Sequence, residues 1–268
     1  MSDARQPPFR NLRRLWGSRE LLLLLSWREI KVRYKQSVMG LAWAILMPAI
    51  IVGAGVLVRV GAAQLTGGHV TADDIASVMV RAVPWSFFAG ALRFGTNSLV
   101  GNTSLVTKIA FPKEVFPISA VLSNGFDFLI AASVVVIGLL LMGWVPSLEA
   151  LWALPLLVML AIFTAGLTML LSALNLFYRD VKYLVEVALT YAIFVTPVLF
   201  PASIAGRWQS IVLLNPIAPI LEGLSDALIG HRTPQLGWVG YSAAVAVTTA
   251  VFGYTVFKWL ETQFAERI

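Results

Sequence analysis

Six long stretches of the sequence carry almost no charge, and they constrain the fold more than any other feature. Only two of them contain a charged side chain, Arg93 in the second and Asp127 in the third. The stretches cover residues 41–58, 83–105, 118–142, 150–176, 187–206 and 236–257. A helix that crosses a membrane needs about 20 mostly apolar residues. The sequence therefore predicts an all-α membrane protein with six transmembrane helices.

The composition excludes the soluble alternatives. Hydrophobic residues make up 58% of the 268 residues and charged residues only 13%, whereas soluble domains hold about 25% charged residues. This difference excludes a soluble enzyme, a coiled coil and a disordered chain. The chain also has no cysteine, so it can form neither a disulfide nor a thiolate metal site.

Lysine and arginine are distributed unevenly among the predicted loops. Most of them fall in residues 1–40, 101–117, 177–183 and 259–268. Because cytoplasmic loops carry an excess of these residues, we expect a multi-pass protein of the cytoplasmic (inner) membrane with both termini in the cytoplasm. The expected parts are a cytoplasmic N-terminus over 1–40, a transmembrane domain over 41–260 and a cytoplasmic tail over 261–268.

Residues 19–37 combine an apolar stripe with basic side chains. At 100° per residue, one side of a helix here carries Leu23, Trp27, Ile30 and Tyr34. A basic amphipathic helix with Trp and Tyr on its apolar side lies in the membrane interface rather than across the membrane. We expect such a helix on the cytoplasmic surface; a merely solvated juxtamembrane helix is the alternative.

The segment 200–235 is too apolar for an aqueous loop and contains too many prolines for one helix. Two short helices that dip into the outer leaflet as a re-entrant segment, broken at Asn215–Pro216, fit it better. Backbone at that depth requires cover from protein or from a water-filled cavity. Glu222 and Asp226 lie four residues apart in this segment. Paired carboxylates can carry out acid–base chemistry, but the polar face of a short helix explains them more simply.

Motifs for catalysis, nucleotide binding and metal binding are missing from the sequence. The string nearest to a P-loop, residues 90–97, lacks the lysine that reaches the phosphates. The two histidines, His69 and His231, have no carboxylate partner at ligand spacing. We therefore expect a chain that is not an enzyme and that binds no metal, cofactor or nucleic acid.

Arg93 and Asp127 are exceptional because a charge at the bilayer centre costs about 2.5–3.5 kcal/mol on insertion scales. The second and third spans are consecutive and antiparallel, so the sequence predicts that Arg93 and Asp127 form an ion pair inside the bundle. Two roles stay open for this pair: a structural contact or part of the lining of a pore.

The predicted loop 101–117 is longer than a connection between antiparallel helices requires. It places aromatic residues beside charged ones, and this combination is typical of a surface on which a partner protein docks. The residues concerned are Lys108, Phe111, Pro112, Lys113, Glu114 and Phe116. A second candidate for docking is the string 178–182.

Several strings in a fixed order resemble the permeases of polysaccharide and teichoic-acid exporters, a group of type-2 ABC transporters. They are Ile30–Gln36, Gly40–Trp43, Pro48, Pro84–Phe88, Asn97–Asn102, Lys108–Pro117, Tyr178–Val181, Asn215–Pro216 and Glu222–Gly223. Each string alone is weakly specific, but the ordered set is specific for this group and extends over most of the chain.

The resemblance implies a homodimer that encloses a translocation channel, with two copies of a separate cytoplasmic P-loop ATPase that binds ATP and Mg. It also implies outward transport of a lipid-linked polymer such as O-antigen, a capsular glycan or teichoic acid. Because ATP is hydrolysed on another polypeptide, the conformational change of that polypeptide must reach this chain through cytoplasmic contacts. We expect these coupling contacts at Trp27, Tyr34, Lys108, Phe111, Pro112, Lys113 and Glu114.

A sliding polymer requires channel walls that bind no single sugar tightly. Flat aromatic rings suit this requirement, because they pack on the C–H faces of successive sugars without fixing a register. The expected lining residues are Trp85, Phe87, Phe88, Tyr191, Phe194, Phe200 and Trp208. Trp and Tyr also form lipid-facing belts, and this alternative stays open for each residue.

Three other functions are alternatives to polymer export. A secondary transporter would show internal repeats and an ion site at the midplane, and neither is evident. A membrane enzyme acting on lipid-linked sugars would rest on Glu222 and Asp226 alone. The main alternative is a type-2 ABC permease that exports a drug or a simple lipid.

Overall fold

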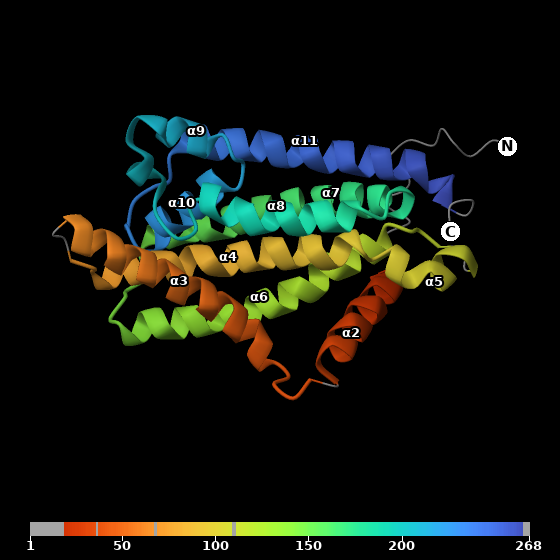
Figure 1. Ribbon diagram of the computed structural model, residues 1–268, viewed down its shortest axis with the longest axis horizontal. Helices are drawn as coiled ribbons and strands as arrows, with labels where there is room; N and C mark the ends of the chain where they lie inside the picture. Colours follow the sequence, from red (N-terminus) through yellow and green to blue (C-terminus); the bar gives the residue numbers. More distant parts are fainter. Residues whose placement is uncertain (1–18, 36, 67–68, 109–110, 265–268) are drawn as a thin grey trace.

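The computed structural model describes residues 19–35, 37–66, 69–108 and 111–264, and the regular structure in these ranges is helical (Figure 1). Its elements are α2 (Arg19–Lys35), α3 (Ala42–Thr66), α4 (Ala72–Thr96), η1 (Val100–Asn102), α5 (Thr103–Lys108), α6 (Val115–Leu141), η2 (Leu148–Trp152), α7 (Ala153–Phe177), α8 (Val181–Val195), η3 (Ala202–Trp208), α9 (Gln209–Leu213), α10 (Ala218–Leu228) and α11 (Leu236–Glu261). The predicted termini, 1–40 and 261–268, lie partly outside the described residues.

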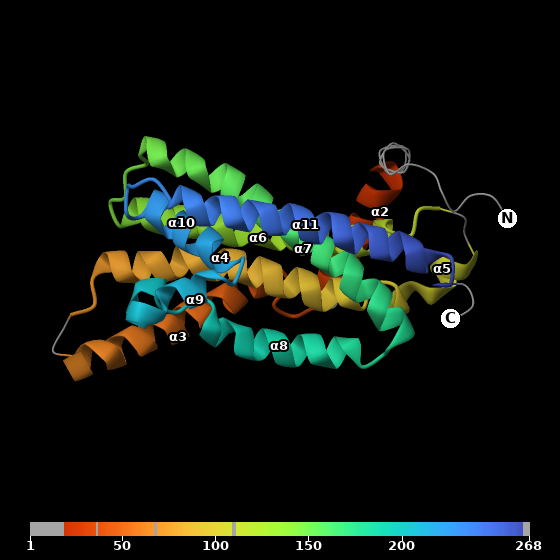
Figure 2. The same ribbon diagram turned by 90° about the horizontal axis from the view of Figure 1, so that it is seen from above.

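The long helices run side by side, and the short ones gather at the two ends of the bundle (Figures 1 and 2). One end holds α5, the start of α2 and the last turn of α11; the other holds η3, α9 and α10. We call these the α5 end and the α10 end. The described residues of the predicted loop 101–117 and the turn 178–180, which were predicted to lie on one side of the membrane, are both at the α5 end.

Five of the described helices are long and apolar enough to cross a membrane: Ala42–Gly61, Ala72–Thr96, Val115–Leu141, Leu148–Phe177 and Leu236–Glu261. The predicted fifth span, 187–206, is not one continuous helix. Its place is taken by α8, which has 15 residues and ends at Val195. Thr196 is extended because it precedes Pro197, and a residue before proline disfavours the helical conformation.

The second span begins earlier than its apolar stretch suggested. Thr71 caps α4 together with Asp74, and the helix then continues through Arg81, which precedes the predicted span 83–105. These charges are tolerated in a long helix because each has a partner. Asp74 pairs with Arg59 of α3, and Arg81 pairs with Glu222 of α10.

Helices α7 and α11 are packed closely through small residues. A side chain at Gly166 would overlap the backbone of Ala250, and one at Gly253 would overlap Gly166. Small residues let helix backbones approach in membranes, where apolar side chains gain little by leaving lipid. This contact fixes α11 against the centre of the subunit.

Burial differs sharply between the helices. In the most apolar 18-residue window of α4, 67% of the residues are buried, against 17% in α3. Helices α3 and α8 both lie at the lower edge of the bundle in the view from above (Figure 2), and both pack against α4. Little of either helix is covered: the window of α3 is the least buried of the five candidate spans, and α8 is buried only along Val185 and Leu189.

Candidate functional site

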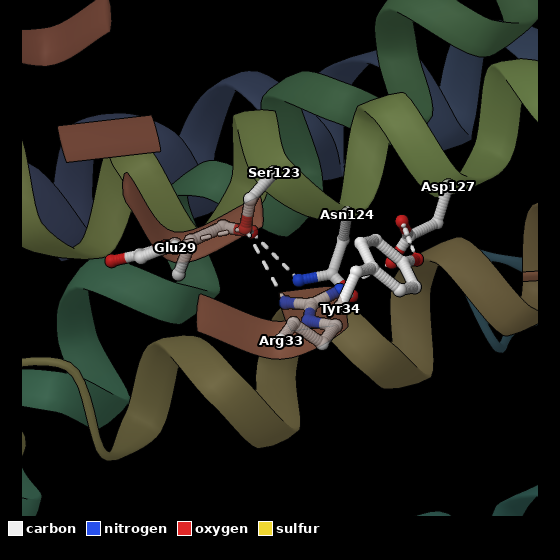
Figure 3. Close-up of polar contacts among 7 residues, drawn as sticks. Glu29, Arg33, Tyr34, Ser123, Asn124 and Asp127 are labelled. Carbon is white, nitrogen blue, oxygen red and sulfur yellow. Dashed lines mark hydrogen bonds and ion pairs between the residues drawn. The ribbon is translucent and has the colours of Figure 1, made fainter. Parts of the chain in front are cut away.

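Helix α2 lies against α6 through polar side chains (Figure 3). Arg33 forms an ion pair with Asp127, and the Tyr34 hydroxyl donates a hydrogen bond to the same carboxylate. Glu29 accepts hydrogen bonds from the hydroxyls of Ser119 and Ser123, at 2.9 and 3.2 Å. Burial raises the pKa of Glu29, although its hydrogen bonds and the nearby arginines act in the opposite direction. The contact is therefore a partly buried polar network.

This geometry corrects the predicted Arg93–Asp127 pair. Asp127 is paired with Arg33, and the Arg93 Nε donates to both carboxylate oxygens of Glu186, at 2.8 and 2.9 Å. The prediction was wrong because it considered only the two adjacent spans. Packing brings α2 onto α6 and α8 onto α4, and each supplies a nearer partner.

The predicted interface helix is confirmed as a helix, but two of the four residues of its predicted apolar stripe, Ile30 and Tyr34, are half-buried rather than exposed. Leu23 and Trp27 are exposed, as a membrane-facing stripe requires. Tyr34, which was assigned to that stripe and to coupling, is half-buried against Asp127 instead. Burial and the Asp127 carboxylate raise the pKa of Tyr34, so its hydroxyl stays a hydrogen-bond donor.

The predicted docking loop contains two aromatic rings of different burial: Phe111 is half-buried, whereas Phe116 is fully buried in the subunit and offers no surface to a partner. The rings of Phe111 and Phe116 lie 5.4 Å apart, and Lys113 Nζ lies 4.7 Å from the centre of the Phe111 ring. Pro112 is half-buried as well. Lys108 ends α5, and its side chain lies outside the description. Phe111, Pro112 and Lys113 thus present part of their surface at the α5 end.

Glu114 is not part of that surface. Only 1% of its side chain is exposed, and one carboxylate oxygen lies 2.7 Å from the Nζ of Lys258 in α11. Lys258 also contacts Glu261 at 2.7 Å, and Glu261 accepts a hydrogen bond from the backbone N–H of Lys113. Burial raises the pKa of Glu114, and the Lys258 ammonium opposes this effect. Glu114 therefore joins the loop to α11 and is unavailable to a partner. Lys258 and Glu261, near the end of the last span, are the sequence features that could have indicated this network.

The predicted channel aromatics separate into two groups. Trp85 and Phe88 are only 3% and 5% exposed, and Phe88 stacks on Phe163 at 5.9 Å. These two residues belong to the core of the subunit, so their assignment to the channel wall is wrong for this chain. The reason is that these two rings lie on the part of α4 that other helices cover, as the contact of Phe88 with Phe163 of α7 shows. Phe87 and Phe200 are half-buried.

The other aromatic group is exposed. Tyr191 and Phe194 on α8 are 66% and 60% exposed, and Trp208 is 55% exposed. The Arg93–Glu186 ion pair links the last turn of α4 to α8 and is nearly half exposed, at 47% and 45% of the two side chains. Charges in a transmembrane segment face protein or water rather than lipid. The exposed side of α8 is thus a candidate for a surface that lipid does not cover.

The break predicted at Asn215–Pro216 is confirmed, since these residues separate α9 from α10. The Asn215 amide donates to Thr196 Oγ1 at 2.8 Å, and its side-chain oxygen accepts from the backbone of Ile217 at 3.2 Å. Glu222 accepts a hydrogen bond from the Ala202 backbone N–H at 3.2 Å and lies 3.5 Å from Arg81 Nε. Each of these residues fixes the α10 end, and the carboxylates of Glu222 and Asp226 are both paired with arginine.

Comparison with known proteins agrees with the strings found in the sequence. Residues 20–229 match the family described as ABC-2 type transporter. The chain is 28% identical over 249 residues to a protein from Klebsiella pneumoniae named O-antigen export system permease protein RfbA, covering 92% of this chain and 94% of the relative. It is 30% identical over 263 residues to a protein of the same name from Myxococcus xanthus, covering 97% of this chain and 99% of the relative. The chain therefore belongs to the ABC-2 type transporter family.

Proposed function

We propose that this chain is the permease of an ATP-driven ABC exporter that moves a lipid-linked polysaccharide outward across the cytoplasmic membrane. The observation that carries the proposal is the similarity to O-antigen export permeases along nearly the whole chain. Export of a drug or a simple lipid is not favoured, because the matched relatives are named for O-antigen export.

The α5 end faces the cytoplasm in this proposal and receives two copies of a P-loop ATPase, which binds the ATP and Mg. Phe111, Pro112 and Lys113 offer a partly exposed surface there, and Trp27 on α2 is exposed as well. The Glu114–Lys258–Glu261 network would transmit movement of this surface to α11. Such a transfer requires a stiff joint, and a buried ion pair with short contacts on both carboxylates provides one.

The exposed edge formed by α3 and α8 is the side on which we place the second copy of the chain and the channel. The exposed Arg93–Glu186 pair supports this placement, because facing lipid would be costly for both charges. Tyr191 and Phe194 would then line the path for the sugar chain, and α8 with the residues up to Phe200 would complete a sixth span. In this arrangement η3, α9 and α10 form the re-entrant segment.

Two measurements test the proposal. Deletion of the chain should make a lipid-linked glycan accumulate inside the cell, and accumulation of another amphiphile would contradict polysaccharide export. The orientation is tested by single cysteines, which this cysteine-free chain allows. A cysteine at position 113 should react only with a reagent that enters the cytoplasm; labelling from outside would reverse the topology.

A further inference from the structure

We propose that the α10 end contains a sugar-binding site, in which one or two neutral sugar units of the exported chain are held after they leave the channel. The inference rests on the proposed function and adds a ligand site to it. Its basis is a polar cavity of about 570 Å³ between the first two long helices and the segment η3–α10. Small-molecule sites measure about 300–1,000 Å³, so the size suits one or two sugar rings.

The cavity wall is built from both hydrogen-bond donors and acceptors. Its members come from α3, α4, η3 and α10, and they include Arg59, Ser77, Arg81, Ser203, Glu222 and Ser225. These segments are far apart in the sequence, and the re-entrant segment must be seated against α4 to form the wall. The site is thus complete only in the folded α10 end.

Arg81 is the residue that points to a ligand. Its side chain is only 5% exposed, and its Nη2 donates to Ser225 Oγ at 3.0 Å. Its Nε lies 3.5 Å from Glu222, but neither Nε nor Nη1 makes a hydrogen bond. Buried polar groups are almost always hydrogen-bonded. Both unused donors are covered by neighbouring atoms, and a rotation of the guanidinium would bring one of them to the cavity, where a ligand oxygen would accept its hydrogen bond.

The charges in the wall favour a neutral ligand, because its three arginines are paired with three of its four carboxylates and the fourth, Asp73, is exposed. Arg59 is paired with Asp74, Arg81 with Glu222, and Arg232 with Asp226. The carboxylates disfavour a phosphate, and the arginines disfavour a cation. Among the described residues, no group of three or more His, Asp or Glu side chains is arranged to hold a metal ion. A sugar hydroxyl both donates and accepts hydrogen bonds, so it matches this alternation of charges.

The position of the site gives it a use in export. Pro201 and Ser203 follow directly after α8, whose exposed aromatic side is the proposed path of the polymer. A sugar unit held here between two cycles of ATP hydrolysis would hinder the chain from sliding back. Weak hydrogen bonds suffice for this purpose, because the sugar must be released when the next cycle of ATP hydrolysis moves the polymer.

The test is site-specific photo-crosslinking in cells that export the polymer. A benzophenone side chain replaces Ser203 in the cavity, Tyr191 on the proposed path, or Leu148 on η2, which is exposed at the same end but outside the cavity. Adducts are detected as a ladder that stains for carbohydrate. We expect adducts at Ser203 and Tyr191 and at least fivefold less at Leu148.

Two variants then test the wall residues. Ser225→Ala removes one partner of Arg81 with little change in volume, and it should lower the Ser203 adduct at least threefold while leaving the Tyr191 adduct unchanged. Arg81→Lys, which keeps the charge, should do the same. An adduct at Tyr191 but not at Ser203, equal adducts at Ser203 and Leu148, or a Ser203 adduct unaffected by both variants would overturn the site and leave the proposed function intact. Absence of carbohydrate adducts at all positions would contradict both.

Discussion

The two ends of the bundle use the same kind of contact in different ways. At the α5 end, Glu114 meets Lys258, and the ammonium lies 2.7 Å from each of two carboxylates. At the α10 end, Glu222 meets Arg81, but the guanidinium keeps donors that make no hydrogen bond and borders a cavity. The first arrangement joins a loop to the last helix. The second leaves hydrogen-bonding capacity for a ligand.

The difference teaches that a buried ion pair does not identify its own role. Replacing such a pair with apolar residues is often neutral for stability, whereas removing one partner is strongly destabilising. The two ends differ in two respects. The ammonium of Lys258 contacts two carboxylates, whereas the guanidinium of Arg81 keeps donors without a hydrogen bond, and only Arg81 borders a polar cavity. The following predictions test that distinction, beginning with the largest expected effect.

Removing the cation at the α5 end should have the largest effect. Lys258→Met leaves the Glu114 carboxylate buried without a partner, and this should cost about 3–5 kcal/mol of folding free energy. The measurement is the thermal stability of the purified protein in detergent. The double variant Glu114→Gln/Lys258→Met should recover most of the loss. If the single variant is as stable as the unmodified protein, the joint does not contribute as described.

Altering the docking surface should abolish export without unfolding the chain. In Phe111→Ala/Lys113→Glu, the aromatic anchor and the adjacent positive charge are both lost, and anchors of this kind dominate binding energy at interfaces. We expect at least a tenfold fall in export and loss of copurifying ATPase, while the chain still inserts. Leu148→Ala at the opposite end serves as the control. Normal export by the double variant would contradict the coupling role.

The contact between α2 and α6 should show a moderate effect that depends on one specific partner. Asp127→Asn removes the charge that Arg33 and Tyr34 share, and hydrogen bonds to charged groups contribute about 1.5–3 kcal/mol. A double-mutant cycle on stability should give a coupling energy between Arg33 and Asp127 and none between Arg93 and Asp127. A coupling energy between Arg93 and Asp127 would instead support the ion pair that the sequence predicted.

The smallest effect is expected on the exposed side of α8. Tyr191→Ala or Phe194→Ala should lower export two- to fivefold with the complex still assembled, because each removes one of several rings along a path. Tyr191→Phe keeps the ring and should export normally. Full export by both alanine variants, or failure through loss of assembly, would reject the aromatic path on this helix.

Several features could be predicted because they depend on neighbours along the chain. Apolar stretches of sufficient length predicted five helices that the structure contains, and the break at Asn215–Pro216 followed from proline chemistry. The prediction of one continuous helix over 187–206 was wrong for a local reason as well. Pro197 ends α8, and its effect on the preceding residue could have been predicted from the sequence.

The membrane class, most of the helices and the family follow from the sequence by itself, because hydropathy, helix breakers and ordered strings are local properties of the chain. Only the tertiary structure decided which charges meet. Arg33 rather than Arg93 reached Asp127, Lys258 enclosed Glu114, and Trp85 turned into the core. These outcomes depend on how each helix is rotated and which helix packs beside it. Packing sets that geometry across more than 90 residues of intervening chain for Arg33 and Asp127, and no local pattern encodes it.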